Sequence, residues 1–305
     1  MTICAILGPT ASGKSEVAIA VAEHTGGEIV SVDSMQVYRG MDIGTAKPDA
    51  AMCQRVPHHL LDLAEPAHDM TVAEFQQVGR TLLADLEARE TPAIVAGGSG
   101  MHFRSLVDPM TFAPSEPALR KALEASPLEE LVAELLAADP NAVAHVDADN
   151  PRRVIRAVEV FRLTGATPSQ RTGSDEYRAL RNYRPERPFR AVGLDPGERL
   201  EARVIERFDA MLAAGLLEEV RSLAPQLGRT ARQAVGYKEL LPVVAGDASL
   251  AEGRQVAISG TLGLAKRQRT YFRRDPRIRW LPWQDDPADR IAAVIEAFEE
   301  PTWTS

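Results

Sequence analysis

Three observations predict that this chain of 305 residues is an α/β protein built on a parallel sheet. Short apolar runs of strand length recur along the chain, at residues 3–7, 28–32, 92–96 and 189–194. Helix-like stretches separate these runs, as they do where parallel strands alternate with helices. Between about residues 112 and 190 helical patterns alone occur. We therefore expect a parallel sheet core with a helical insertion lobe.

The first apolar run leads into a glycine-rich stretch that fits the phosphate-loop pattern G-x-x-x-x-G-K-[ST] at every fixed position. In such a loop, backbone N–H groups and the positive end of the next helix surround a phosphate. Lys14 adds a positive charge, and the Ser15 hydroxyl can ligate Mg²⁺. A chance match is expected in on the order of 1% of chains of this length. We predict a P-loop NTPase-like core that binds a di- or triphosphate through Gly8, Pro9, Thr10, Ala11, Ser12, Gly13, Lys14 and Ser15.

The composition is that of an ordinary globular protein, 45% hydrophobic and 26% charged. No apolar run approaches the roughly 20 residues that span a bilayer, and the N-terminus lacks the basic region and cleavage site of a secretion signal. The two cysteines, Cys4 and Cys53, are too few for a disulfide framework or a cysteine metal site. We expect a cytoplasmic protein with no membrane partner and no redox chemistry.

The formal net charge of −8 argues against a general nucleic-acid binder, but the charge is unevenly distributed. Residues 112–150 carry two basic and eight acidic residues, a balance of −6, whereas residues 151–190 carry ten arginines and four acids, a balance of +6. A second basic cluster, opposed along the chain by Asp275, contains Lys266, Arg267, Arg269, Arg273, Arg274, Arg277 and Arg279. Local patches of this kind can bind phosphates. For any single arginine, a solvated position or an ion pair within the protein is the competing interpretation.

Three polar residues are candidates for chemistry beside the phosphate loop. Asp33 follows the second strand, where α/β proteins place substrate groups, which favours it over the alternative of a turn or helix-cap aspartate. Ser99 lies in the second glycine-rich strand end, 97–100, which should face the first. Arg207 lies at the edge of the apolar stripe of a helix over 198–214, so it needs an anionic partner. That partner is either an acid of the protein or a ligand phosphate.

We expect the insertion to divide the chain into segments 1–111, 112–190 and 191–305. The adjacent histidines His58 and His59 should point in opposite directions on an extended segment, and no further cluster completes a zinc site.

Within the insertion, Asn150-Pro151 predicts the start of a helix. The helical spacing places Arg152 and Arg156 on one face with Glu159, and Arg153 on the apolar stripe. It therefore predicts that Arg153 is the arginine that points inward.

Taken in order, these motifs resemble those of the tRNA dimethylallyltransferases, also called tRNA isopentenyltransferases or the IPP transferase family. The matching stretches extend over nearly the whole chain: GPTASGKS, DSMQVYRGMDIGTAKP, VPHHLLD, TVAEF, AGGSG, NPRRVIRAVEV, RVIERFDAMLAAGLLEEV, AVGYKE and LAKRQ. Together they are far more specific than the phosphate loop alone.

The resemblance implies transfer of a dimethylallyl group from dimethylallyl diphosphate to N6 of the adenine 3′-adjacent to the anticodon in tRNA, with Mg²⁺ and release of pyrophosphate. It implies that Asp33 is the general base and that Arg207, together with Lys14, stabilises the departing pyrophosphate. Ser99 takes the position of a threonine that helps to bind diphosphate or RNA, and Ser15 is the expected metal ligand.

The resemblance also implies that the insertion is a mobile lobe that grips the anticodon stem-loop of tRNA, and we expect a monomer. The expected tRNA-binding residues are Asp33, Ser34, Met35, Gln36, Ser99, Arg152, Arg153, Arg156, Lys266 and Arg267. Two departures from the family pattern affect the expected RNA contacts: His102 stands where the family has an aromatic ring, and Leu262-Gly263 lacks a basic residue.

The main alternative function is a P-loop small-molecule kinase that uses ATP, with the insertion as its lid. Against it, the strand at 94–96 ends in Gly-Gly-Ser rather than in the aspartate of a magnesium-binding strand. A nucleotide-dependent RNA-binding switch without chemistry is a third alternative, and it leaves Asp33 and Arg207 without a role.

Overall fold

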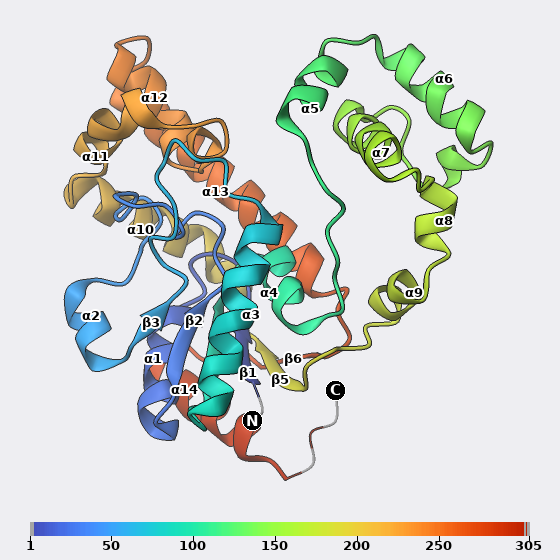
Figure 1. Cartoon of the computed structure of the whole chain (residues 1–305). Coiled ribbons are helices and arrows are strands. Elements are labelled where there is room, and N and C mark those ends of the chain that lie inside the picture. Colours follow the sequence, from blue (N-terminus) through green and yellow to red (C-terminus); the bar gives the residue numbers. More distant parts are fainter. Residues whose placement is uncertain (1–2, 302, 304–305) are drawn as a thin grey trace. The chain divides into compact units, whose positions relative to one another are not determined.

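The computed structural model of the chain describes residues 3–301 and 303 (Figure 1). The chain forms two compact units, a larger one made of residues 1–107 and 187–305 and a smaller one made of residues 108–186. The sequence placed the insertion at 112–190, so the structure begins and ends it slightly earlier along the chain. None of the described helices is both long and apolar enough to cross a membrane.

The larger unit contains a six-stranded sheet in the order β3-β2-β4-β1-β5-β6. Its strands are β1 (Ile3–Leu7), β2 (Glu28–Ser31), β3 (His58–His59), β4 (Ala93–Gly97), β5 (Phe189–Gly193) and β6 (Ile278–Trp280). Every neighbouring pair is parallel, and Leu7 at the end of β1 lies opposite both Gly97 and Gly193. The predicted α/β class with a parallel sheet is therefore confirmed.

Helices cover both faces of this sheet. Side chains alternate between the faces along β1, so Ala5 and Leu7 pack into one core while Ile6 packs into the other. The core around Ile6 includes residues of α1 (Lys14–Thr25) and α14 (Pro287–Glu299). The opposite core includes residues of α3 (Val72–Ala88), α4 (Gly100–Val107), α10 (Leu200–Ala213), α11 (Leu216–Leu223), α12 (Tyr237–Ala245) and α13 (Leu250–Phe272).

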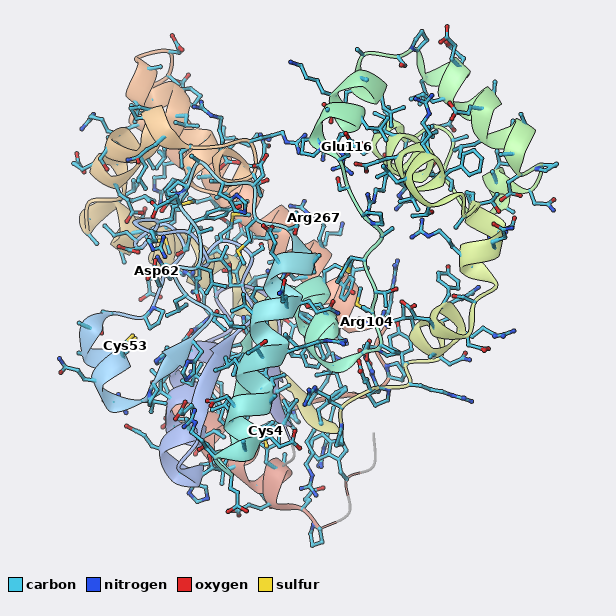
Figure 2. The ribbon with its side chains drawn as sticks, in the orientation of Figure 1. Cys4, Cys53, Asp62, Arg104, Glu116 and Arg267 are labelled. Atoms are coloured by element: carbon cyan, nitrogen blue, oxygen red, sulfur yellow. The ribbon has the colours of Figure 1, made fainter. Side chains whose placement is uncertain are left out.

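Local sequence signals account for where several of these helices begin and end. Thr71 and Glu74 form the expected capping box at the start of α3. The short helix α2 (Ala50–Arg55) begins at Asp49, whose side chain accepts a hydrogen bond from the Met52 amide. Cys53 of α2 is exposed, and Cys4 of β1 is partly buried and packs beside the Ile6 core (Figure 2). Burial raises the pKa of the Cys4 thiol to about 11, which fits a small apolar packing residue and not a reactive one.

The smaller unit is helical throughout. Its helices are α5 (Pro117–Glu124), α6 (Leu128–Ala138), α7 (Pro151–Thr164), α8 (Pro168–Thr172) and α9 (Asp175–Arg181). Asn150 caps α7 as expected, with Pro151 at the first helical position and Gly165 in a left-handed conformation at the end. Leucine and valine side chains of α5, α6 and α7 form a separate core.

Candidate active site

Two adjoining cavities lie in the larger unit, at the carboxyl edge of the sheet. The polar cavity, of about 80 Å³, is lined by Thr10, Lys14, Ser15, Ser31, Asp33, Gln36, Thr45, Ala46, Ala96, Gly97, Gly98, Arg207 and Gln268. The second cavity, of about 90 Å³, has a mixed lining and is called the apolar cavity after the Val204, Phe208, Met211 and Leu264 side chains in it. Its lining is Thr10, Ala11, Asp33, Met35, Gly44, Thr45, Val204, Arg207, Phe208, Met211, Ala234, Val235, Thr261, Leu264 and Gln268. The residues common to both linings form the junction between the cavities: Thr10, Asp33, Thr45, Arg207 and Gln268.

The sheet explains why these residues meet. The phosphate loop follows the central strand β1, Asp33 follows its near neighbour β2, and Gly98 follows β4, which lies between them. Because parallel strands end at the same edge of a sheet, the residues that follow them converge there. The sequence prediction that the two glycine-rich strand ends face one site is consistent with this arrangement.

The phosphate loop has the backbone conformation that a phosphate cradle requires. Ala11 and Gly13 have left-handed backbone conformations, with φ of 61° and 75°. Because Ala11 is not a glycine, its backbone is strained in this conformation. The Arg203 guanidinium holds the loop by donating from Nε to the Ala11 carbonyl at 2.7 Å. Lys14 folds back over the loop, and its Nζ donates to the Pro9 carbonyl at 2.5 Å and to the Ser12 hydroxyl at 3.2 Å.

The electrostatic environment of Lys14 is unusual for a lysine. Burial, together with the positive charge of Arg207, lowers the pKa of the Lys14 ammonium to about 7, and the Asp33 carboxylate only partly opposes this. Burial likewise lowers the pKa of Arg207, with Asp33 opposing the shift and Arg203 adding to it. Two basic side chains are thus buried together at this site, with the Asp33 carboxylate offsetting only part of their charge, and such an environment favours binding of an anion.

Asp33 has both roles that the sequence left open. Its Oδ1 accepts hydrogen bonds from the Met35 amide at 2.8 Å and the Gln36 amide at 3.4 Å, so it is a turn aspartate. Its other carboxylate oxygen has no hydrogen-bond partner among the described residues, and the side chain lines both cavities. One oxygen thus fixes the carboxylate while the other is available to a ligand.

Arg207 enters no hydrogen bond or ion pair with any residue that the structure describes, although it lines both cavities. Of the two partners that the sequence left open, the protein acid is present only as the nearby Asp33, which attracts Arg207 without forming an ion pair. A ligand anion stays as the predicted partner.

Ser99 lies differently from the sequence expectation. Its hydroxyl is hydrogen-bonded to Nδ1 of His102 at 2.7 Å, and Gly97 and Gly98, not Ser99, line the polar cavity. His102 is buried, and its ring meets Phe75 edge-on at 4.5 Å. Burial lowers the pKa of His102 to about 4, so the ring is neutral at neutral pH. His102 therefore holds the Ser99 hydroxyl in a hydrogen bond.

The four predicted positions after β2 divide between the cavities. Met35 lines the apolar cavity and Gln36 the polar one, whereas Ser34 lines neither. The Gln36 side chain is fully oriented: Oε1 accepts from the Ser31 hydroxyl at 2.9 Å, and Nε2 donates to the carbonyls of Thr45 and Ala46 at 3.1 and 3.2 Å.

The prediction for the arginines of α7 is wrong in one respect. Arg153 does not point inward: its side chain is 67% exposed and lies 3.5 Å from Asp147. Arg156 points inward instead, because the Glu159 carboxylate, with 0% exposure, accepts from its guanidinium at 2.7 Å. Arg120 donates to the same carboxylate at 2.6 Å. Arg152 is exposed and has no ion pair within the described residues.

The second basic cluster is partly neutralised by Asp275 within it and by Asp195 and Glu300 outside it. Arg269 and Arg273 both contact Asp195, at 2.7 and 3.2 Å. Arg277 is paired with Asp275 at 2.7 Å, and Arg279 is paired with Glu300. Lys266 and Arg267 are exposed on α13 and have no ion pair among the described residues, so they keep their charge available (Figure 2 labels Arg267).

The histidine pair has a structural role. His58 Nδ1 is hydrogen-bonded to the Val56 carbonyl at 2.8 Å, and His59 Nε2 contacts Glu28 at 2.6 Å. No group of three or more His, Cys, Asp or Glu side chains that could hold a metal occurs in the described part of the chain.

Sequence reasoning missed a clamp on the loop that carries Gly44 and Thr45. The Glu219 carboxylate of α11 accepts hydrogen bonds from three successive amides, those of Asp42 at 3.0 Å, Ile43 at 2.8 Å and Gly44 at 3.0 Å. The Tyr237 hydroxyl of α12 donates to the same carboxylate. A Cβ on Gly44 would lie 2.4 Å from the Tyr237 ring, so only glycine fits there. No local sequence signal joins these positions, because they come from three separate segments.

Sequence reasoning also missed Gln268 of α13, which a periodicity test could have found. Gln268 stands three residues after buried Ala265 and four before buried Phe272, so a polar side chain occupies the buried stripe of the helix. Its Oε1 accepts the hydrogen bond of the Thr10 amide at 2.8 Å, and it belongs to the junction of the cavities.

The fold and the site together define a class: a P-loop α/β protein whose phosphate loop opens into a polar cavity that adjoins an apolar one. The sequence matches the family model described as IPP transferase over residues 36–275. A tRNA dimethylallyltransferase of a Nocardioides species is 41% identical, with 97% of this chain and 96% of the relative covered. The chain belongs to the IPP transferase family.

Solved structures agree with this assignment. The full-length tRNA isopentenylpyrophosphate transferase of Bacillus halodurans is 32% identical, with a TM-score of 0.71 and coverage of 97% of this chain and 94% of that one. A eukaryotic dimethylallyltransferase acting on tRNA, at 23% identity, has a TM-score of 0.79, with 97% of this chain and 79% of that chain covered, and supports the fold. The resemblance inferred from the motifs is confirmed, and the kinase alternative finds no support among these relatives.

Proposed function

We propose that this protein transfers a dimethylallyl group from dimethylallyl diphosphate to N6 of the adenine 3′-adjacent to the anticodon in tRNA, releasing pyrophosphate. The observation that carries the proposal is the pair of cavities that meet at Asp33 and Arg207, in a chain of this family. An allylic diphosphate has one charged end and one apolar end, and the cavities offer one compartment for each.

The polar cavity suits the diphosphate. An allylic diphosphate ionises readily, so the catalyst mainly has to stabilise negative charge on the leaving group. Loop amides, Lys14 and Arg207 supply that charge stabilisation, and Arg207 has no other partner among the described residues. The loop residues Gly8 to Ser15 would contact the diphosphate, and Ser99 would support the strand end beside it through His102.

The apolar cavity suits the five-carbon group. Its volume is about 90 Å³. An apolar cavity of about 150 Å³ holds the six carbons of benzene, so five carbons need about 125 Å³ and would extend from this cavity into the junction. Phe208, Met211 and Leu264 form part of its wall.

Asp33 is placed to act as the general base. An adenine amine is a poor nucleophile, and a carboxylate that takes its proton in the transition state accelerates attack. The free carboxylate oxygen of Asp33 lies at the junction, where the amine would have to meet the allylic carbon. The turn hydrogen bonds at Oδ1 hold the base in place without occupying the reacting oxygen.

The residues present suit a divalent metal, and we propose Mg²⁺. Ser15, whose hydroxyl can ligate Mg²⁺, lines the polar cavity, while the free oxygen of Asp33 is kept for the N6 proton. Mg²⁺ is usually held by one or two protein oxygens, with the remaining positions filled by substrate phosphates and water. A single hydroxyl ligand from Ser15 fits this coordination. When bound, the metal would neutralise part of the charge on the leaving pyrophosphate.

Binding of tRNA would involve residues outside the two cavities. A stacked base hides its amine, so the adenine must be extruded to reach the junction. We propose that exposed Lys266 and Arg267 and the exposed Arg152 contact RNA phosphates, that residues 33–36 contact the extruded nucleotide, and that the smaller unit is the lobe that grips the anticodon stem-loop. Arg153 and Arg156 would have to exchange their present acidic partners to join them. We further propose that the enzyme acts in the cytoplasm as a monomer.

The test of this function uses two labels. The protein is incubated with unmodified tRNA and Mg²⁺, in parallel with labelled dimethylallyl diphosphate and with γ-labelled ATP. We expect label in tRNA from the prenyl donor alone, and digestion to nucleosides should give N6-dimethylallyladenosine. Phosphate transfer from ATP, or no label from the prenyl donor, would refute the proposal.

A further inference from the structure

Gln268 is the junction residue whose role the proposed chemistry leaves open. It lies on α13, and its side chain contacts Thr10 in the loop after β1 and approaches Gly98 at the end of β4. A Cβ on Gly98 would lie 2.4 Å from Gln268 Nε2, so the strand end is glycine where the amide passes. The amide is therefore inserted between the phosphate loop and the second glycine-rich strand end.

The orientation of the Gln268 amide follows from its one protein contact. A backbone N–H can only donate, so the atom 2.8 Å from the Thr10 amide is the side-chain oxygen. The nitrogen then occupies the opposite side of the amide group. No hydrogen-bond partner for Nε2 exists among the described residues, and Gln268 lines both cavities. The junction thus contains a fixed, neutral N–H donor that is not used by any residue the structure describes.

In an allylic diphosphate one ester oxygen joins the allylic carbon to the first phosphorus atom. Because this oxygen links the apolar end to the charged end, it must lie where the two cavities meet. We propose that Gln268 is a further catalytic residue, whose Nε2 donates to the diphosphate oxygen that takes up negative charge as the C–O bond breaks. In that step the electron pair of the allylic C–O bond goes to this oxygen, adenine N6 forms the new C–N bond, and Asp33 receives the N6 proton. The inference rests on the proposed function.

The neighbouring charges explain why a neutral donor is useful at this position. Lys14 and Arg207 already place two cationic groups in the polar cavity with no acid but Asp33 beside them in its lining. A third cation would add repulsion in the unliganded site, whereas an amide adds a preorganised donor without charge. The same amide holds the Thr10 amide, so it also links α13, which carries Lys266 and Arg267, to the phosphate loop.

Two substitutions separate donation to the substrate from support of the loop. Gln268→Glu keeps an acceptor for the Thr10 amide but removes the donor, and Gln268→Met removes both while keeping a side chain of similar length. Gln255→Glu is the matched control, because Gln255 is an exposed residue of the same helix. The measurements are the single-turnover rate of prenyl transfer, pyrophosphate affinity by calorimetry, tRNA affinity without diphosphate, and the melting temperature.

We expect both Gln268 variants to lower the single-turnover rate by about 10²-fold or more, as loss of one oxyanion donor does. Pyrophosphate affinity should fall further in Gln268→Glu than in Gln268→Met, with tRNA affinity unchanged in both. The melting temperature should stay unchanged in Gln268→Glu and fall in Gln268→Met, which leaves the Thr10 amide without its acceptor. A rate that falls in Gln268→Met but is retained in Gln268→Glu would overturn the inference, since support of Thr10 would then be the whole role. Rates for both variants equal to that of Gln255→Glu would overturn it as well.

The pyrophosphate measurement keeps this inference separate from the proposed function. If the unsubstituted protein binds pyrophosphate in a Gln268-dependent way but does not prenylate tRNA, the proposed function fails and the donor role stands. If it prenylates tRNA and the substitutions change neither rate nor pyrophosphate affinity, the donor role fails and the proposed function stands.

Discussion

At the scale of single residues, the site is defined by charges held in place before any ligand arrives. Lys14 is tied to the Pro9 carbonyl and the Ser12 hydroxyl, and its pKa of about 7 leaves it only partly protonated at neutral pH. A diphosphate beside it would favour the charged form and raise that pKa. Binding of the anion and protonation of Lys14 are therefore linked.

Because the pKa of Lys14 is lowered in the protein, the affinity for pyrophosphate should depend on pH. Below pH 7 Lys14 is charged with or without ligand, so its titration does not reduce the affinity for pyrophosphate. As the pH rises through 7, binding of pyrophosphate must also add a proton to Lys14, and the affinity falls by up to about tenfold per pH unit. Calorimetry of pyrophosphate binding at pH 7.5, in buffers of different ionisation enthalpy, should show uptake of a fraction of a proton beyond that of pyrophosphate itself.

Lys14→Arg provides the control for this measurement, because an arginine stays charged throughout the range. The extra proton uptake and the extra loss of affinity above pH 7 should both disappear in the variant. Equal proton uptake by the two proteins would show that Lys14 does not titrate on binding.

Residue-scale expectations from the sequence agree with the geometry where a residue's neighbours along the chain determine its position. Asp33, expected beside the phosphate loop because it follows a strand, lines both cavities, and its role as the base stays a prediction. Arg153 was assigned the wrong direction because helical spacing counts apolar neighbours and cannot see that Glu159 on the same helix is buried with Arg120 from another. The Ser99–His102 contact was missed for a related reason, since the sequence marks His102 only as a departure from a family pattern.

At the scale of elements, the loop after β2 is positioned by helices that come almost two hundred residues later. Glu219 of α11 accepts the amides of Asp42 to Gly44, and Lys47 on the same loop contacts Asp42 at 2.5 Å and Asp62 at 2.6 Å. The loop in turn supplies the carbonyls that orient Gln36 in the polar cavity. The loop that lines the cavities through Gly44 and Thr45 is thus attached to α11 by hydrogen bonds to the Glu219 carboxylate.

Substitution of that carboxylate should be costly. Glu219→Gln would put a donating NH₂ group among four donors, and we expect a loss of about 1–3 kcal/mol in the free energy of unfolding. Tyr237→Phe removes one donor and keeps the ring against Gly44, so its loss should be smaller, about 1 kcal/mol. Urea denaturation measures both.

Glu218→Gln is the matched control for the clamp. Glu218 is the preceding residue of α11, is 68% exposed and contacts Arg221 at 3.5 Å. Its loss should stay below about 0.5 kcal/mol. If Glu218→Gln and Glu219→Gln destabilise the protein equally, the clamp contributes nothing specific to stability.

At the scale of the whole molecule, the α/β class, the parallel sheet and the helical insertion could all be predicted from the sequence. Strand-length apolar runs and a phosphate loop carry that information locally. The expected bounds of the insertion, 112–190, differ by four residues at each end from those of the smaller unit, 108–186. The division of the site into a polar and an apolar cavity could not be predicted, since their shared lining draws residues from the loops after β1 and β2 and from α10 and α13, which have no sequence pattern in common.

The central claim is that a carbon group is transferred, with Asp33 as the base and the polar cavity as the seat of the leaving diphosphate. Asp33→Asn tests it most directly, because an asparagine keeps the oxygen that accepts the Met35 and Gln36 amides but cannot take a proton. Asp49→Asn is the matched control, since it too keeps an oxygen that caps a backbone amide, at the start of α2.

The measurement is the single-turnover rate of dimethylallyl transfer to tRNA. For Asp33→Asn we predict a fall of about 10²–10⁴-fold, with tRNA affinity retained and pyrophosphate affinity unchanged or higher because a negative charge has left the cavity. The rate for Asp49→Asn should match that of the unsubstituted protein. Transfer by Asp33→Asn at an undiminished rate, or a loss of tRNA affinity as large as the loss of rate, would contradict the account.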